Sequence, residues 1–127
     1  MARVTGIGGV FIRSGDPKTL AAWYAEHLGI ELEDYGVATL RWTDEVPAGT
    51  GQTVWSPFAK DTEYFGDASQ QVMINYRVDD LEALLAQLAE AGVWIDPKRE
   101  DEGYGKFAWI KDLEGNRLEL WEPLAGT

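Results

Sequence analysis

The amino-acid sequence predicts an α+β fold made of two βαβββ modules in tandem within a single domain, residues 1–127. The order strand, helix and three strands can be traced twice along the chain. Similar segments also recur at a nearly constant spacing. Pairing Gly9 with Met73 gives an offset of 73 − 9 = 64, and pairing Trp55 with Trp121 gives 121 − 55 = 66. Such a near-repeat indicates an internal duplication.

Module one is expected to span residues 3–58. Its first strand, 3–13, is rich in strand-forming side chains but contains three glycines, which often mark a bend or a close approach. Asp16 is typical of a helix N-cap and Pro17 of the first helical position. Gly29 is expected to end this helix. Its apolar face carries Leu20, Trp23, Tyr24 and Leu28.

Three further segments complete module one. Residues 31–35 and 37–42 are predicted to form a hairpin about Gly36. Residues 43–51 contain proline and glycine, which favour a loop. Residues 52–58 are predicted to be the last strand of this module.

Module two is expected to span residues 71–123, after a polar and acidic connector at 59–70. Asp79, followed three residues later by Glu82, is typical of a capping box at the start of a helix. Gly92 is expected to end that helix. Its buried face would be formed by Leu81, Leu84, Leu85 and Leu88.

The strands of module two are predicted at 71–78, 93–98, 106–111 and 117–123, and the charged stretch 99–105 joins two of them. Asp112 and Gly115 indicate a tight turn before the last strand, because aspartate caps the local backbone and glycine tolerates positive φ. In that strand, Leu118 and Leu120 alternate with Glu119. This period of two predicts a half-buried strand that directs the carboxylate away from the leucines.

The composition narrows the range of partners. The chain has 11 basic and 22 acidic residues, a net charge of −11. This charge would repel a phosphate backbone, so we expect no nucleic-acid partner, whereas a cationic small molecule would be attracted. The absence of cysteine excludes disulfides and thiolate chemistry. No apolar run approaches the ~18 residues of a membrane span, and no signal core is apparent, so we expect a cytoplasmic protein.

Four motifs, at 9–16, 23–29, 78–81 and 112–120, resemble signatures of the vicinal oxygen chelate superfamily. This superfamily includes glyoxalases, extradiol dioxygenases and bleomycin-resistance proteins. The resemblance covers nearly the whole chain, and its most specific motif is Asp-x-x-Gly-Asn-x-x-Glu-Leu, which begins at Asp112. It implies paired βαβββ modules, each with a sheet curved to form a cleft (the glyoxalase/bleomycin resistance fold), and a homodimer.

Metal enzymes of this superfamily take ligands from the first and last strands of each module. The corresponding positions here are Gly9, Thr53, Met73 and Glu119. Glycine has no side chain, the thioether is too soft for a hard divalent ion and the threonine oxygen is a weak ligand. Because catalytic metals need about three protein ligands, we expect neither a metal nor a cofactor. His27, the only histidine, is either a lone acid/base or a favourable cation at a helix C-terminus.

Strand alternation predicts which side chains line the cleft. Besides Glu119, the predicted ligand-binding residues are Phe11, Thr53, Trp55, Met73, Asn75, Arg77, Phe107, Trp109 and Trp121. An apolar aromatic wall with a few polar groups is typical of a small-molecule pocket and suits a planar or cationic compound. Alternatively, the rings fill the hollow or a dimer interface, and Glu119 pairs with Arg77 or Arg117 as a stabilising contact.

Three functions therefore remain open. The first is a metal-free protein, resembling the bleomycin-resistance branch, that sequesters an aromatic or cationic organic compound without turnover. The second is a glyoxalase- or isomerase-type lyase in which Glu119 is the general base and Arg77 or Asn75 stabilises an oxyanion. The third is a small interaction protein that dimerises through its sheet edges and acidic loop.

Overall fold

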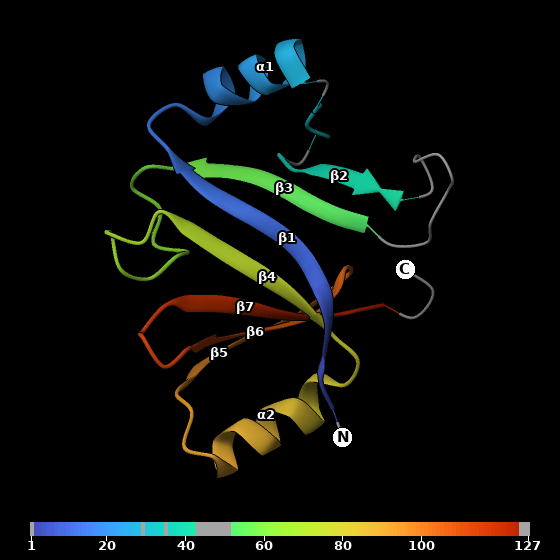
Figure 1. Cartoon of the computed structure of the whole chain (residues 1–127), viewed down its shortest axis with the longest axis vertical. Helices are drawn as coiled ribbons and strands as arrows, with labels where there is room; N and C mark the ends of the chain where they lie inside the picture. The colour runs from blue at the N-terminus through green and yellow to red at the C-terminus, as the bar shows by residue number, and fades with distance from the viewer. Residues whose placement is uncertain (1, 29, 35, 43–51, 125–127) are drawn as a thin grey trace. The chain divides into compact units, whose positions relative to one another are not determined.

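The computed structural model describes residues 2–28, 30–34, 36–42 and 52–124, which form two helices and seven strands (Figure 1). The fold class is α+β, as the sequence predicts. The chain divides into two compact units. The C-terminal unit is Met1–Gly8 with Met73–Thr127, and the N-terminal unit is Gly9–Val72. The chain passes from the first of these units to the second in the middle of strand β1.

The N-terminal unit holds one helix and the strand order β2-β3-β1. Its elements are β1 (Val4–Ser14), α1 (Pro17–Leu28), β2 (Ala38–Arg41) and β3 (Gln52–Ala59). β3 pairs in parallel with β1 and antiparallel with β2. Asp16 caps α1 as predicted, because its carboxylate accepts the amide of Thr19 at 3.1 Å.

The hairpin predicted about Gly36 is wrong, because β2 pairs with β3. The described residues 31–34 form no strand and instead lead into a tight turn. There Glu33 donates its amide to the carbonyl of Val37 and accepts the amide of Gly36, at 2.8 and 2.9 Å. The φ angle of Gly36 is +91°, which glycine adopts without steric cost. The loop predicted at 43–51 lies outside the described residues.

The C-terminal unit has the strand order β1-β4-β7-β6-β5. Its further elements are β4 (Val72–Val78), α2 (Leu81–Glu90), β5 (Ile95–Glu102), β6 (Gly105–Lys111) and β7 (Arg117–Pro123). β4 and β7 are parallel, whereas β6 is antiparallel to both of its neighbours. The charged stretch predicted to join two strands mostly belongs to β5, since its ladder with β6 continues to Glu102.

Asp79, predicted to cap α2, is not its N-cap. Asp80 takes that place, and its carboxylate accepts the amide of Ala83 at 3.1 Å. The carboxylate of Asp79 accepts the amide of Arg3 at 2.9 Å and so ties the start of β1 to the end of β4. Glu82, the predicted partner in a capping box, forms an ion pair with an arginine of β5 instead. Either aspartate could cap the helix. The hydrogen bond from the Arg3 amide engages Asp79, which leaves Asp80 as the cap.

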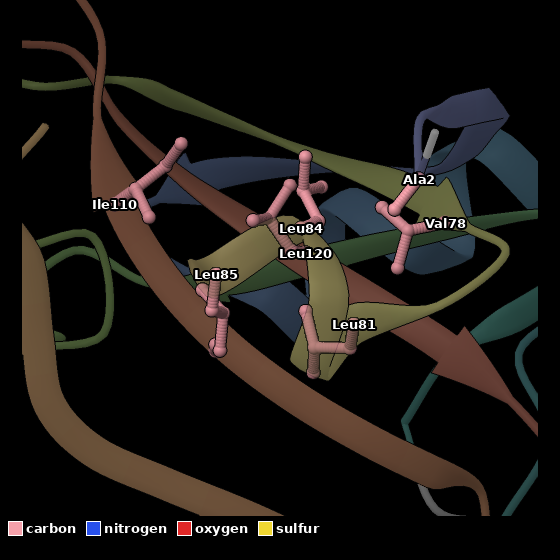
Figure 2. Packing of buried hydrophobic residues seen from close by; sticks show 8 residues of the cluster. Ala2, Val78, Leu81, Leu84, Leu85, Ile110 and Leu120 are labelled. Atoms are coloured by element: carbon pink, nitrogen blue, oxygen red, sulfur yellow. The ribbon is translucent and has the colours of Figure 1, made fainter. Parts of the chain in front are cut away.

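The core of the C-terminal unit lies between α2 and its sheet (Figure 2). It contains the predicted helix face, with Leu88 at its edge, and side chains from the strands: Ala2, Val78, Leu81, Leu84, Leu85, Ala108, Ile110 and Leu120. Alternation therefore places the intervening strand residues on the opposite face of the sheet, here called the site face. It carries Met73, Asn75, Arg77, Phe107, Trp109, Arg117, Glu119 and Trp121.

Neither described helix has the length and apolar character needed to cross a membrane.

Candidate functional site

Glu119 lies at the centre of the site face, with an exposed fraction of 1%. Asn75 stands beside it in the parallel β4–β7 register, and Trp109 stands opposite it in the antiparallel β6–β7 register. The Asn75 amide donates to one carboxylate oxygen at 2.5 Å, and the indole Nε1–H of Trp109 donates to the other at 3.0 Å. Each oxygen has a buried donor, so the carboxylate is held in one orientation.

An aromatic stack lies next to this carboxylate. Trp121 and Phe107 are parallel, with 5.9 Å between ring centroids and 2° between ring planes. The guanidinium of Arg77 lies 5.1 Å from the centroid of the Trp121 ring. Partial burial lowers the pKa of Arg77 from its ordinary value. The indole of Trp121 is further fixed because it donates to the carbonyl of Tyr104 at 2.8 Å.

A charged network supports Trp109, which is fully buried. Lys98 and Arg117 place their cationic groups 5.2 and 5.6 Å from its ring. Arg117, one of the predicted partners of Glu119, forms an ion pair with Asp96 at 2.9 Å. The backbone amide of Lys98 and the guanidinium of Arg117 lower the pKa of Asp96. The network thus fixes the indole that donates to Glu119.

Gly8 is part of the site, although it is not among the predicted site residues. A Cβ atom there would lie 2.1 Å from Asn75 Oδ1, 2.9 Å from Trp121 Cε3 and 3.1 Å from Arg77 Cγ. Asn75 Oδ1 therefore lies against the backbone of β1, and it has no hydrogen-bond partner among the described residues. Gly8 and Gly9 of this strand do mark a close approach, but the sequence does not show what approaches.

The predicted face of Thr53 and Trp55 is wrong. β1 and β3 are in register so that Phe11 lies beside Ser56. Adjacent residues of paired strands point to the same face, so Ser56 shares the face of Phe11, and alternation turns Thr53 and Trp55 to the other. There the Trp55 ring contacts Tyr24 of α1, with 4.5 Å between centroids.

The wrong face was predicted for Thr53 and Trp55 because the two modules were aligned with an offset of 66 at this strand. The offset of 66 aligns two tryptophans that face different ways. The registers pair Phe11 with Ser56 and Asn75 with Glu119, which gives 75 − 11 = 64 and 119 − 56 = 63. Ser56, rather than Thr53, is therefore the counterpart of Glu119. Its hydroxyl donates to the carbonyl of Gly36 at 3.0 Å.

The predicted metal-ligand positions are Gly9, Thr53, Met73 and Glu119, and their side chains do not fit a catalytic divalent metal. Gly8 and Gly9 have no space for a liganding side chain, since a Cβ at Gly9 would lie 2.8 Å from the carbonyl oxygen of Val54. Met73 offers a thioether, and both oxygens of Glu119 accept hydrogen bonds already. The part of the chain that the structure describes contains no group of three His, Cys, Asp or Glu residues arranged for a metal. The side chain of His27 lies outside that part.

A model of the Glyoxalase/Bleomycin resistance protein/Dioxygenase superfamily matches residues 6–120, and the chain belongs to this superfamily. A search of curated proteins gave no match.

Several solved structures share the fold. Methylmalonyl-CoA epimerase from Mycobacterium tuberculosis is 26% identical over 94% of this chain and 89% of that one, with a TM-score of 0.62. A variant of the Streptomyces coelicolor methylmalonyl-CoA epimerase, in complex with 2-nitronate-propionyl-CoA, is 18% identical over 97% and 100%, with a TM-score of 0.66. A protein described as NAD-dependent benzaldehyde dehydrogenase from Legionella pneumophila is 13% identical over 91% and 97%, with a TM-score of 0.59.

Proposed function

We propose that this protein binds an aromatic or cationic organic molecule on the site face without a catalytic metal and without turnover. The observation that carries this proposal is the state of Glu119. It is the only conventional metal donor at the predicted positions, and both its oxygens accept hydrogen bonds from Asn75 and Trp109. Such a carboxylate is a fixed acceptor within the wall of a site rather than a vacant ligand for an ion.

The surroundings of Trp121 favour a ligand with a planar ring. Phe107 and Arg77 are half-buried and flank the buried indole, so they are the parts of this stack that a ligand reaches first. Aromatic rings bind planar molecules by offset or edge-to-face contacts, and a cationic group gains from a ring face. The net charge of −11 attracts cationic ligands over longer distances.

A ligand screen tests this proposal. Aromatic and basic compounds are added to the purified protein, and binding is followed by thermal shift and tryptophan fluorescence. We expect saturable binding that Phe107→Ala weakens about tenfold, which corresponds to ~1.4 kcal/mol of lost contact. Trp23→Phe, on α1 of the N-terminal unit, is the control and should leave affinity unchanged. The proposal fails if no compound shifts the melting temperature.

Metal content provides an independent test. Elemental analysis of protein purified without chelators should find Ni, Zn, Fe and Mn well below one equivalent per chain. Metal held tightly at one equivalent would refute the metal-free assignment, because the donors described above would then have to rearrange around it.

A second candidate is an isomerase in which Glu119 is the general base. It is favoured by the contact of Glu119 with Asn75, an amide able to stabilise an oxyanion, and by the similarity to structures named methylmalonyl-CoA epimerase. The substrate class would be acyl-CoA thioesters with an acidic α-proton. Incubation with methylmalonyl-CoA in D₂O would show deuterium at the α-carbon, and Glu119→Gln would abolish it. Glu122→Gln is the matched control, because Glu122 faces α2 and accepts the amide of Leu81.

We also propose a homodimer, as the sequence resemblance implies. Light scattering should give twice the chain mass of 14.1 kDa. A dimer that binds no ligand in the screen above would favour the third function, an interaction protein.

A further inference from the structure

Arg13 fixes the connector that leaves the N-terminal unit. Its guanidinium donates to four backbone carbonyls of this segment, and its backbone amide donates to a fifth, at Gln71, at 3.0 Å. The four carbonyls are those of Lys60 at 2.8 Å, Thr62 at 2.9 Å, Gln70 at 3.1 Å and Asp67 at 3.4 Å. Residues 60–71, here called the strap, are all described and contain neither helix nor strand. One side chain therefore satisfies carbonyls from both ends of the strap.

The strap carries two aromatic rings onto the face of β1 and β3 that lies opposite α1. Phe65 is fully buried. Its ring centroid lies 5.3 Å from that of Phe58 and 5.0 Å from the guanidinium carbon of Arg13. Tyr64 is half-buried and stacks on Phe58, with 5.1 Å between centroids and 15° between planes, and lies 6.4 Å from Phe11. Phe65 is thus the anchor of the strap, and Tyr64 covers a surface formed by Phe11 and Phe58.

We propose that Arg13 closes the strap, and that Tyr64 occupies a slot on Phe11 and Phe58 which takes a flat aromatic ligand when the strap opens. A planar ring bound there would replace the stacked ring of Tyr64 with one of the same kind. This goes beyond the proposed function, because it concerns the N-terminal unit and closure can be measured without a ligand.

The chemistry of the clamp explains why one residue can control the whole segment. Guanidinium presents five N–H donors in a planar fork, so it bonds several carbonyls at once, whereas an ammonium group holds fewer in a fixed geometry. Segments held by few backbone hydrogen bonds open locally at lower free energy than the strands beside them. In the strap, the amides of Gly66 and Gln70 close short turns by donating to the carbonyls of Glu63 and Asp67. These amides therefore report opening.

Hydrogen exchange tests the clamp. In Arg13→Gln, we expect the amides of Gly66 and Gln70 to exchange at least about tenfold faster, because charge-assisted hydrogen bonds are lost. Arg13→Lys should give an intermediate rate. Arg99→Gln, which removes an exposed arginine of the C-terminal unit, is the control and should not change the strap. Unchanged exchange of the strap in Arg13→Gln would overturn the proposal.

Should Arg13→Gln fail to fold, the natural chain answers the same question. Its strap amides should exchange by local opening, with a weaker dependence on denaturant than the amides of β1 and β3. The proposal is overturned if the strap amides and the strand amides exchange with the same free energy and the same dependence on denaturant. The strap would then not open as a separate element.

The slot is tested with 1-anilinonaphthalene-8-sulfonate, a planar aromatic probe. Tyr64→Ala should bind it about fivefold more tightly than the unaltered protein, since the competing ring is gone. Adding Phe58→Ala should remove this gain. Tyr104→Ala deletes an exposed tyrosine of the other unit and is the matched control. The proposed slot is refuted if Tyr64→Ala binds the probe no more tightly than the unaltered protein does. It is also refuted if Tyr104→Ala shows the same gain in affinity.

Discussion

In the C-terminal unit the parallel strand pair sets Glu119 beside Asn75, whereas in the N-terminal unit the equivalent pair sets Ser56 beside Phe11. The first pair forms a buried polar centre with Trp109. The second belongs to a face covered by the aromatic rings of the strap. The same strand pairing therefore presents a carboxylate in one unit and an apolar surface in the other. The topology fixes where a functional side chain would stand, but not which chemistry it has.

The largest effect on the free energy of unfolding is expected at Gly8, in the C-terminal unit. Gly8→Ala should lower the free energy of unfolding by about 3 kcal/mol, because its methyl group would overlap Asn75 and Trp121 and force the polar centre apart. Urea denaturation measures this loss. Gly6→Ala is the control on the same strand, where no described atom lies within 4 Å of the added carbon. Equal losses in both variants would contradict the close packing of β1 on the site face.

The next largest difference is expected between the two counterparts, Glu119 and Ser56. Glu119→Gln keeps the shape but turns an amide toward one of the two buried donors, which should cost about 2 kcal/mol. Ser56→Ala removes one hydrogen bond to the carbonyl of Gly36 and should cost about 1 kcal/mol. Chemical denaturation of both variants gives the comparison. A smaller loss for Glu119→Gln than for Ser56→Ala would break it.

A smaller difference in the free energy of unfolding is expected between two ion pairs of the C-terminal unit. One is Arg117–Asp96, next to Trp109, and the other is Arg99–Glu82, on the surface. The side chains of Arg117 and Asp96 are 11% and 20% exposed, against 38% and 59% for Arg99 and Glu82. Asp96→Asn should lower the free energy of unfolding by about 1 kcal/mol. Glu82→Gln should leave it nearly unchanged, because water screens an exposed pair. Equal losses in thermal denaturation would place both pairs in the same environment.

The smallest effect concerns acid. A lowered pKa is found for Asp79, Glu82, Asp96 and Asp112 of the C-terminal unit and for Asp16 of the N-terminal unit. Hydrogen bonds to the charged form are the main cause; the Asn116 side chain, for instance, lowers the pKa of Asp112.

A lowered pKa in the folded state gives stability above the unfolded value, 3.8 for Asp and 4.5 for Glu, and this stability is lost as the pH falls through the folded value. Acidification below about pH 4.5 should therefore weaken the C-terminal unit first. Amide exchange followed by NMR from pH 6 to pH 3 measures protection in each unit. Earlier loss of protection in the N-terminal unit would contradict this expectation.

The sequence alone determined the features that depend on neighbouring residues. Asp16 and Pro17 predicted the start of α1, because capping is a local hydrogen bond. Asp112 and Gly115 predicted the turn before β7, where the carboxylate accepts two backbone amides and φ of Gly115 is +85°. In β7 the leucines and Glu119 differ so strongly in polarity that alternation assigned both faces correctly.

Only the tertiary structure decided features that depend on the partner strand. In β3 both alternating sets contain apolar residues, Trp55 in one and Phe58 in the other, so period two could not show which set faces α1. The register of β1 with β3 resolved that choice, and the carbonyls bonded by Arg13 gave the connector its form. Hydrophobic alternation orders the residues within a strand, but the identity of the facing element is a long-range property that the finished packing sets.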